Sequence, residues 1–256
     1  MMSTEERKTI YLCLAHMSEE GFEQKYVKEA FDTNWVVPMG PNVNAFEQNL
    51  ADFANANLDG SKLDRKVVCL SAGTAAVHLA LIACGVKAGD EVCVQSFTFC
   101  ASSHPITYLG AKPVFIDSER ETWNMDPELL EKAIVERKAV TGKYPKAIIP
   151  VALYGMPYDC ERIMAIADKY GIPVIEDAAE GMGSRFNGQV LGTFGRFGVL
   201  SFNGNKMITT SGGGALICRN EEDANNIMWH ATQARDAYPY YQHTEIGYNY
   251  RMSNVC

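Results

Sequence analysis

Short apolar segments alternate with amphipathic segments along most of the chain. From Val67 onward, apolar runs are followed by stretches whose apolar positions recur with the period of a helix. This alternation predicts an α/β domain with a mostly parallel sheet, because each helix returns the chain to the start of the next parallel strand. The predicted strands are VVCL, EVCVQ, KPVFID, KAIIPVAL, IPVIED, FGVLSF and GGALIC, and the predicted helices between them are TAAVHLALIAC, DPELLEKAIVERK and CERIMAIADKY.

Residues 1–60 follow a different pattern, in which helix-period apolar positions occur without strand-like runs. Two helices are predicted there, over FEQKYVKEAF and VNAFEQNLADFAN. The sequence therefore divides into an N-terminal helical segment, residues 1–60, and an α/β large domain, residues 61–256. We expect the helical segment to pack on the large domain.

Composition and charge exclude some classes of function. The 256 residues are 47% hydrophobic and 21% charged, which is typical of a globular protein. A formal charge of -8 makes a nucleic-acid partner unexpected. No apolar run reaches transmembrane length, and MMSTEERKTI lacks the apolar centre of a signal peptide, so no membrane association and a cytoplasmic location are expected.

The cysteines fit a reducing compartment. They form no CxxC pair and no ladder of metal-ligand spacings. Several lie in apolar runs, where a thiol packs as a small hydrophobic group, so we expect neither disulfides nor a metal site. The eight are Cys13, Cys69, Cys84, Cys93, Cys100, Cys160, Cys218 and Cys256.

Candidate site residues follow the predicted strands, where a parallel sheet binds its ligands. In SAGTAAVHLAL, a turn of small residues precedes a helix that begins near Thr74. Backbone N–H groups at a helix N-terminus bind anions, although an ordinary strand–helix turn has the same composition. In VIEDAAEGMGS, Glu176 and Asp177 end a strand. A carboxylate there could bind a metal, accept a proton, pair with a heterocyclic N–H⁺ or cap a helix.

Lys206 follows a later strand, in a loop of small and hydroxyl residues. Most loop lysines are only solvated, but a partly buried lysine can act as an amine nucleophile, and Ser201 lies close before it. QSFTFCASSHP offers Phe97 or Phe99 as a flat face for a ring, or as core packing. An anion site, an aromatic face, a strand-end aspartate and a lysine together describe a pocket for pyridoxal 5′-phosphate (PLP).

The chain resembles the DegT/StrS-type PLP-dependent sugar aminotransferases. The resemblance is carried, in chain order, by SAGTAAVHLAL, VIEDAAEGMGS, SFNGNK, TTSGGGAL and GYNYRMS. It implies the large domain of the fold-type I, aspartate-aminotransferase architecture. The residues it assigns are Gly73, Thr74 and Ser201 on the cofactor phosphate, Phe99 on the pyridine ring, Asp177 on the ring nitrogen, Glu180 on cofactor or substrate, Lys206 as the lysine of the internal aldimine, and Asn249 on the phosphate in the neighbouring subunit.

This resemblance also implies an activity. Family members transfer an amino group from glutamate to a keto-sugar on a nucleotide, and NGNK with ITTSGGG resembles the subgroup acting on UDP-linked 4-keto-6-deoxy amino sugars. Asp177 would keep the ring nitrogen protonated, and Lys206 would move the proton between substrate and cofactor carbons. Asn249 implies a homodimer with shared active sites.

Two departures and three alternatives accompany the resemblance. Ala152 stands where many relatives have His or Asp, and the chain ends at Cys256, where relatives continue into a small C-terminal domain. We therefore expect that domain to be missing, which favours a non-catalytic PLP-binding protein as one alternative. A PLP-dependent sugar dehydratase would have histidine in place of Lys206. A nicotinamide-dependent oxidoreductase would need a glycine fingerprint, which SAGTAA is not.

Overall fold

A single mixed sheet runs through the computed structural model, which describes residues 17–256. Two ladders, β1-β9-β8-β5 and β3-β2-β4, are joined by parallel bridges from Ile148 to Val174 and from Val151 to Asp177. Strand β9 is antiparallel to both neighbours, and the other pairings are parallel, which confirms the mostly parallel sheet. The strands are β1 (Lys66–Leu70), β2 (Glu91–Gln95), β3 (Lys112–Ile116), β4 (Ala147–Ile149), β5 (Ile175–Asp177), β8 (Phe197–Ser201) and β9 (Gly214–Cys218), with a separate hairpin of β6 (Arg185–Phe186) and β7 (Gln189–Val190).

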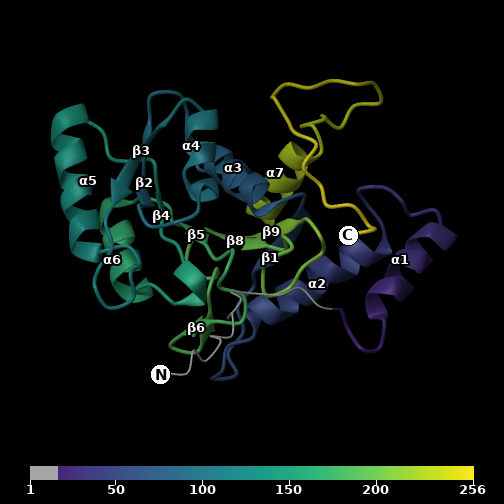
Figure 1. Cartoon of the computed structure of the whole chain (residues 1–256). Coiled ribbons are helices and arrows are strands. Elements are labelled where there is room, and N and C mark those ends of the chain that lie inside the picture. Colours follow the sequence, from purple (N-terminus) through teal and green to yellow (C-terminus); the bar gives the residue numbers. More distant parts are fainter. Residues whose placement is uncertain (1–16) are drawn as a thin grey trace, which may run out of the picture.

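Helices cover both faces of this sheet (Figure 1). Alternate residues of each strand point to opposite faces, so the core divides into two clusters. One cluster packs under α2, α5 and α6, and the other under α3, α4 and α7. The helices are α1 (Phe22–Asp32), α2 (Pro41–Asn55), α3 (Gly73–Ala83), α4 (His104–Tyr108), α5 (Pro127–Thr141), α6 (Cys160–Tyr170) and α7 (Glu221–Ala231), with short 3₁₀ turns η1 (Cys100–Ser102) and η2 (Leu153–Gly155).

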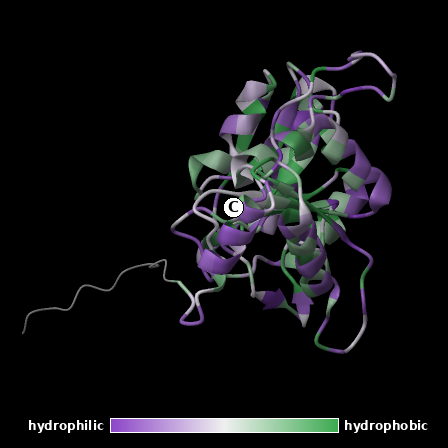
Figure 2. Cartoon of the chain, turned by 90° about the vertical axis from the view of Figure 1, so that its right-hand side faces the viewer, coloured by the Kyte–Doolittle hydropathy of each residue, from purple (hydrophilic) through white to green (hydrophobic). Residues whose placement is uncertain are grey.

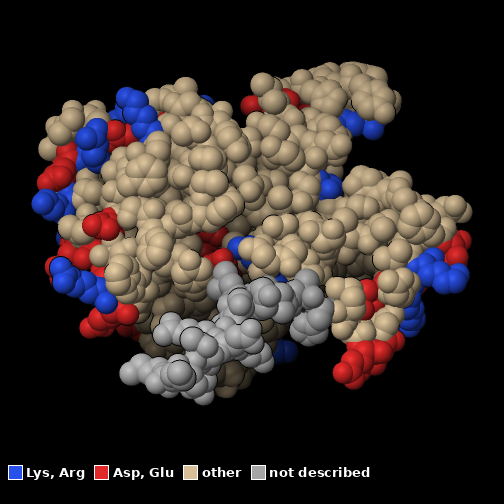
Figure 3. Space-filling model, in the orientation of Figure 1, with Lys and Arg blue, Asp and Glu red and all other residues tan. Residues whose placement is uncertain are grey.

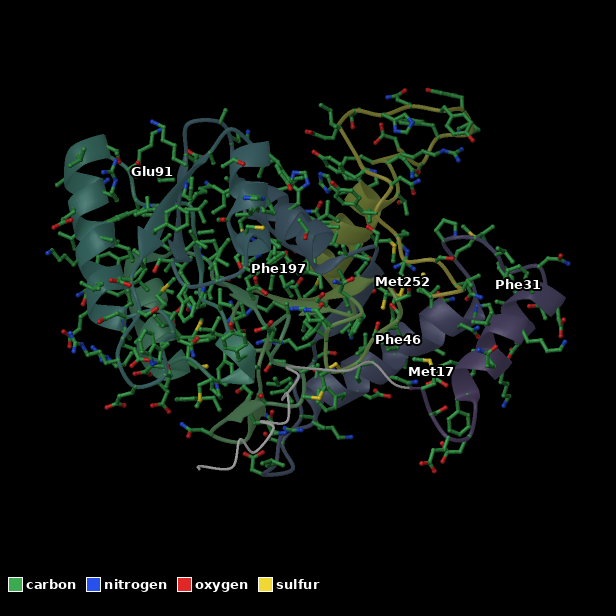
Figure 4. The ribbon with its side chains drawn as sticks, viewed as in Figure 1. Met17, Phe31, Phe46, Glu91, Phe197 and Met252 are labelled. Carbon is green, nitrogen blue, oxygen red and sulfur yellow. The ribbon has the colours of Figure 1, made fainter. Side chains whose placement is uncertain are left out.

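Hydropathy follows this layering. The central strands are hydrophobic and the outer helices carry hydrophilic faces (Figure 2). Phe197, at the start of β8, lies in the middle of the sheet, and Phe46 lies on α2 (Figure 4). Phe46 packs on Phe202 in the other core cluster, with ring centroids 5.1 Å apart. Phe31 of α1 points away from the sheet and is exposed.

Helix α7 is the main element that the hydrophobic pattern did not predict. Its first turn is acidic, and few of its residues are buried. The helix is instead marked by its N-cap, because the side chain of Asn220 accepts a hydrogen bond from Asp223 N (2.8 Å). Arg196 then pairs with Asp223 through Nη2 and Oδ1 (2.6 Å), which ties α7 to the start of β8.

In the part of the chain that the structure describes, every cysteine is free; Cys13 lies outside those residues. Burial raises the pKa of Cys84 and of Cys93 to about 12, so both remain thiols at neutral pH. Residues 17–256 contain no cluster of His, Cys, Asp and Glu that could hold a metal ion. Within the same residues, no helix combines the length and the apolar character needed to cross a membrane.

Charged side chains gather at the two ends of the molecule, over α5 and α6 and over α1 (Figure 3). Both signs are interspersed there, so neither end forms a single-sign patch. Between them, the visible face is largely uncharged.

Candidate functional site

A cavity of about 630 Å³ lies where the strands end. Its walls come from the segments that follow β1, β2, β4, β5 and β8, which is the ligand-binding edge of a parallel sheet. Seven of the eight site residues assigned from the sequence line this cavity, and they are Gly73, Thr74, Phe99, Asp177, Glu180, Ser201 and Lys206.

One end of the cavity is an open helix N-terminus. Helix α3 begins at Gly73, and its N-cap Ala72 has no side-chain cap, so the first N–H groups face the cavity without a side-chain acceptor. Thr74 and Ser201 add hydroxyl groups. A Cβ at Gly73 would lie 3.1 Å from Ser201 Cβ, so glycine lets the helix end approach β8 closely. Together these groups form a cradle for an anion.

Part of the glycine run after Lys206 is also explained by close packing against the start of α3. A Cβ at Gly214, the first residue of β9, would lie 2.4 Å from Gly73 N and from the Ala72 carbonyl carbon. Strand β9 therefore passes directly against the turn that begins α3. At Gly212 a Cβ would meet nothing within 4 Å, so only part of the run is required by close packing.

Asp177 forms a buried carboxylate on the cavity wall. Ser102 Oγ donates to its Oδ2 (2.5 Å), Ala179 N donates to its Oδ1 (3.2 Å), and Thr98 Oγ1 lies 2.7 Å from Ser102 Oγ. Burial raises the pKa of Asp177, against the opposing effects of these hydrogen bonds and of the positive charge of Lys206. A cationic N–H in the cavity would be a favourable partner for this carboxylate.

Glu176 faces the other way, although it is adjacent in sequence. Its Oε1 accepts from Phe194 N (2.6 Å) and Gly195 N (2.6 Å), and its Oε2 accepts from Gly192 N (3.0 Å). Strand alternation in β5 therefore assigns the two carboxylates to different faces. Of the pair, Asp177 belongs to the cavity and Glu176 holds the turn before β8.

Lys206 lies in the cavity with Glu180 as its counter-ion. Its Nζ donates to Glu180 Oε1 (3.2 Å), and its side chain is 13% exposed. The other oxygen, Glu180 Oε2, accepts from Tyr154 N (2.8 Å). Tyr154 has a positive φ of 51°, a strained conformation for a tyrosine that this hydrogen bond helps to fix. The sequence analysis missed this role of Tyr154, because positive φ at a non-glycine residue has no sequence signal.

Phe99 and Phe97 both line the cavity, with exposed fractions of 74% and 46%. Neither belongs to the core, so the core-packing alternative is wrong for both. Sequence reasoning also missed Ser102, which lies four residues after Thr98 and whose hydroxyl donates to Asp177. Ala152 is buried, and its Cβ faces Gly181 rather than the cavity.

Asn249 is the one assigned residue outside the cavity. It is exposed, on a segment that forms an antiparallel bridge to Thr232. Its neighbours Tyr248 and Tyr250 are partly buried against α3. This placement separates Asn249 from the cavity of its own chain.

The residues present fit PLP. The cradle at α3 suits a phosphate, Asp177 suits a protonated ring nitrogen, Phe99 offers a flat face, and Lys206 is a primary amine on the same cavity. The cavity is also large enough for such a cofactor, since small-molecule sites are typically about 300–1,000 Å³.

Comparison with known proteins points to one family. The model of the DegT/DnrJ/EryC1/StrS aminotransferase family matches residues 17–256. The chain is 50% identical over 248 residues to EpsN of Bacillus subtilis (strain 168), whose name places it among the pyridoxal phosphate-dependent aminotransferases; the match covers 97% of the chain and 61% of EpsN. It is 37% identical to the GDP-perosamine synthase of Escherichia coli O157:H7, over 96% of the chain and 64% of that enzyme.

A solved structure agrees with these matches. Spr1654 of Streptococcus pneumoniae, named as a sugar aminotransferase and solved in a PLP form, superposes with a TM-score of 0.83 at 28% identity. The superposition covers 97% of the chain and 64% of Spr1654. The chain thus has the fold of the PLP-dependent aminotransferases, and it spans about three fifths of the length of the relatives it matches.

Proposed function

Since the chain belongs to the DegT/DnrJ/EryC1/StrS aminotransferase family, whose cofactor is PLP, we propose that it transfers an amino group from glutamate to a nucleotide-linked keto-sugar. The observation that carries the proposal is the meeting of Lys206, Asp177 and the open α3 N-terminus on one cavity. The chain spans 61% of EpsN, so the activity is proposed for the whole protein. Lys206, Asp177 and the α3 N-terminus would form its cofactor site.

The cofactor, when bound, supplies an electron sink for the amino-acid carbon. Gly73, Thr74 and Ser201 would bind its phosphate through N–H and hydroxyl groups, and Phe99 would cover a face of its ring. Asp177 holds a proton at the ring nitrogen, which its fixed position beside Ser102 Oγ favours. These residues orient the group for proton transfer.

Lys206 supplies the mobile proton. Its Nζ would hold the resting cofactor, and the free amine would accept and return a proton at the substrate carbon. Glu180, 3.2 Å from that Nζ, keeps the amine on the cavity side of its loop. The presence of a lysine here also argues against the sugar dehydratase.

The acceptor is proposed to be a UDP-linked 4-keto-6-deoxy amino sugar, whose amination would serve polysaccharide or glycan precursor synthesis in the cytoplasm. Support comes from the loop NGNK, which resembles the loop of the subgroup that acts on such sugars. Three residues of this loop, Asn203, Asn205 and Lys206, line the cavity. The GDP-perosamine synthase among the relatives makes a GDP-linked sugar the competing acceptor.

We propose a homodimer in which Asn249 serves the partner's cofactor. The support is its exposure outside its own cavity. We also propose that the N-terminal segment expected at residues 1–60 packs on a large domain at 61–256, because Val43 and Leu50 of α2 are buried in the core cluster that includes β1. Residues 1–16 of that segment lie outside the described residues.

The deciding experiment uses the full-length protein. Purified protein is loaded with PLP, treated with glutamate, and then given a panel of UDP- and GDP-linked keto-sugars. We expect glutamate to convert the cofactor to its amine form and one UDP-linked keto-sugar to be aminated. Cofactor that binds but never reacts with glutamate would instead establish the non-catalytic alternative.

Lysine attachment is tested separately. The wild-type protein should show a cofactor absorbance band that borohydride reduces, and Lys206→Ala should lack it. Absence of such a band from the PLP-loaded wild type would refute the proposed site.

A further inference from the structure

An aromatic cluster lies beside α3, the helix whose N-terminus forms the phosphate cradle, and outside the cavity. Its centre is His78, which is 5% exposed and contacts the edges of Tyr108 and Tyr248, with ring centroids 5.5 and 4.9 Å away. His78 Nδ1 lies 3.4 Å from Tyr250 Oη. Tyr248 and Tyr250 stack at 5.0 Å. We call these four residues the His78 cluster; none of them lines the cavity.

The segment that carries Asn249 is held along its backbone on both sides. On one side, Tyr248 N donates to His230 O (2.7 Å) and Tyr250 N donates to Ala231 O (3.0 Å), at the end of α7. On the other, Ser71 N donates to Tyr250 O (2.8 Å), one residue before the turn that forms the phosphate cradle. The segment is therefore an extended strap between α7 and the end of β1.

Extended geometry fixes the direction of Asn249. Side chains at i and i+2 share a face, and the residue between them points the other way. With Tyr248 and Tyr250 partly buried against His78, the side chain of Asn249 must face outward. The cluster thus sets the position of a residue that it does not contact.

We propose that His78, with Tyr248 and Tyr250, is a positioning residue that presents Asn249 to the cofactor site of a second copy of the chain. The inference rests on the proposed shared dimer site and adds to it the element that holds the donated residue. His78 Nε2 is buried without a partner among the described residues, which costs stability, so stability alone does not account for a histidine at this position. Burial also lowers the pKa of His78, which keeps the ring neutral beside Tyr250.

A different effect must be separated from this one. His78 and Gly73 lie on the same helix, so a His78 variant could disturb the phosphate cradle of its own chain. The two effects differ in which active site they damage. Positioning of Asn249 acts on the partner's site, whereas distortion of α3 acts on the site of the same chain.

Mixed dimers with one lysine-competent site distinguish them. In the first dimer, one subunit carries His78→Phe with Lys206→Ala and the other is wild type, so the competent site receives Asn249 from the variant subunit. In the second, His78→Phe and Lys206→Ala lie in different subunits, so the competent site receives Asn249 from a subunit with His78 intact. Two affinity tags isolate each dimer, and the readout is the rate at which the borohydride-reducible band is lost on dilution.

We expect the first dimer to lose cofactor roughly three- to tenfold faster than a dimer of Lys206→Ala with wild type, as for one lost hydrogen-bonded contact. The second dimer should match that reference. Tyr250→Phe, which removes only the hydroxyl at His78 Nδ1, should repeat the pattern more weakly. Tyr241→Phe, at an 80% exposed position, is the matched control and should change neither dimer.

The opposite pattern, with faster loss in the second dimer only, overturns the proposal and assigns His78 to its own cradle. Equal effects or no effect in the two dimers overturn it as well. A dimer with Asn249→Ala and Lys206→Ala in one subunit reports on the shared site itself. If that dimer retains cofactor normally, or if the protein is monomeric, the shared-site proposal has failed and this inference with it.

Discussion

At the scale of single residues, Glu176 and Asp177 show how one step along a strand changes the role of a carboxylate. Both are buried, and burial raises the pKa of both. Glu176 satisfies its oxygens with three backbone N–H groups, whereas Asp177 has one hydroxyl, one N–H and an open side toward the cavity. The carboxylate with unused acceptor capacity is the one that can serve a ligand.

Asp177→Asn is expected to stabilise the cofactor-free protein while removing its function. A raised folded-state pKa favours the protonated acid, so stability is full below the ordinary Asp value of 3.8 and falls as the pH rises through the folded-state pKa. Asparagine has no such titration. Chemical denaturation should therefore show the variant more stable by about 0.5–2 kcal/mol at pH 7. The difference should vanish near pH 3, and a less stable variant at pH 7 would contradict the argument.

Glu180→Gln tests the counter-ion of Lys206. Glutamine oxygen can still accept from Tyr154 N, but the charge that holds Lys206 Nζ is lost. We expect roughly a tenfold slower reaction of the bound cofactor with glutamate, as for one charge-assisted hydrogen bond, with the borohydride-reducible band retained. Stopped-flow absorbance measures the rate, and an unchanged rate would show that Glu180 does not position the lysine.

At the scale of elements, the site depends on how closely β9 passes the turn between β1 and α3. This approach requires a residue without a side chain at Gly214, since a Cβ there would lie 2.4 Å from Gly73 N. The antiparallel strand in an otherwise parallel sheet thus forms a backing for the phosphate cradle. Its register on β8 places Gly214 opposite Ser201, which keeps both groups at the same end of the cavity.

Gly214→Ala should cost about 1–3 kcal/mol in the free energy of unfolding, as overpacking does, and should weaken cofactor binding. Gly204→Ala is the matched control in the same β8–β9 loop, because its Cβ would meet nothing within 4 Å and it does not line the cavity. Thermal unfolding and equilibrium titration with PLP measure the two effects. Equal behaviour of the two variants would show that β9 can move away from the turn.

At the scale of the whole molecule, the cavity and Asn249 lie at different places on one chain. Seven assigned residues line the cavity, and the eighth is exposed on the strap beside α7. A second copy would bring an eighth residue to each site. In the proposed shared site, the chain would therefore supply seven groups to its own cavity and Asn249 to the cavity of a second copy.

Asn249→Ala is expected to speed cofactor loss by roughly three- to tenfold without unfolding the chain, because its exposed side chain has no packing role. Dilution of PLP-loaded protein, followed by the cofactor band, measures the rate, and sedimentation gives the oligomeric state. A strictly monomeric protein with full cofactor retention would contradict the shared site.

The strands, most helices and the residues at the strand ends could be predicted from the sequence, because apolar periodicity records which faces are buried. It also gave the family, since five motifs occur in a fixed order. The fold added what the motifs did not contain: Glu176 is turned away onto three backbone N–H groups, and Glu180 contacts both Lys206 and Tyr154. It also showed that Ser102 donates a hydrogen bond to Asp177 and that His78 contacts Tyr250 of the strap. Those contacts join residues far apart in the chain, and no local pattern records such a distance.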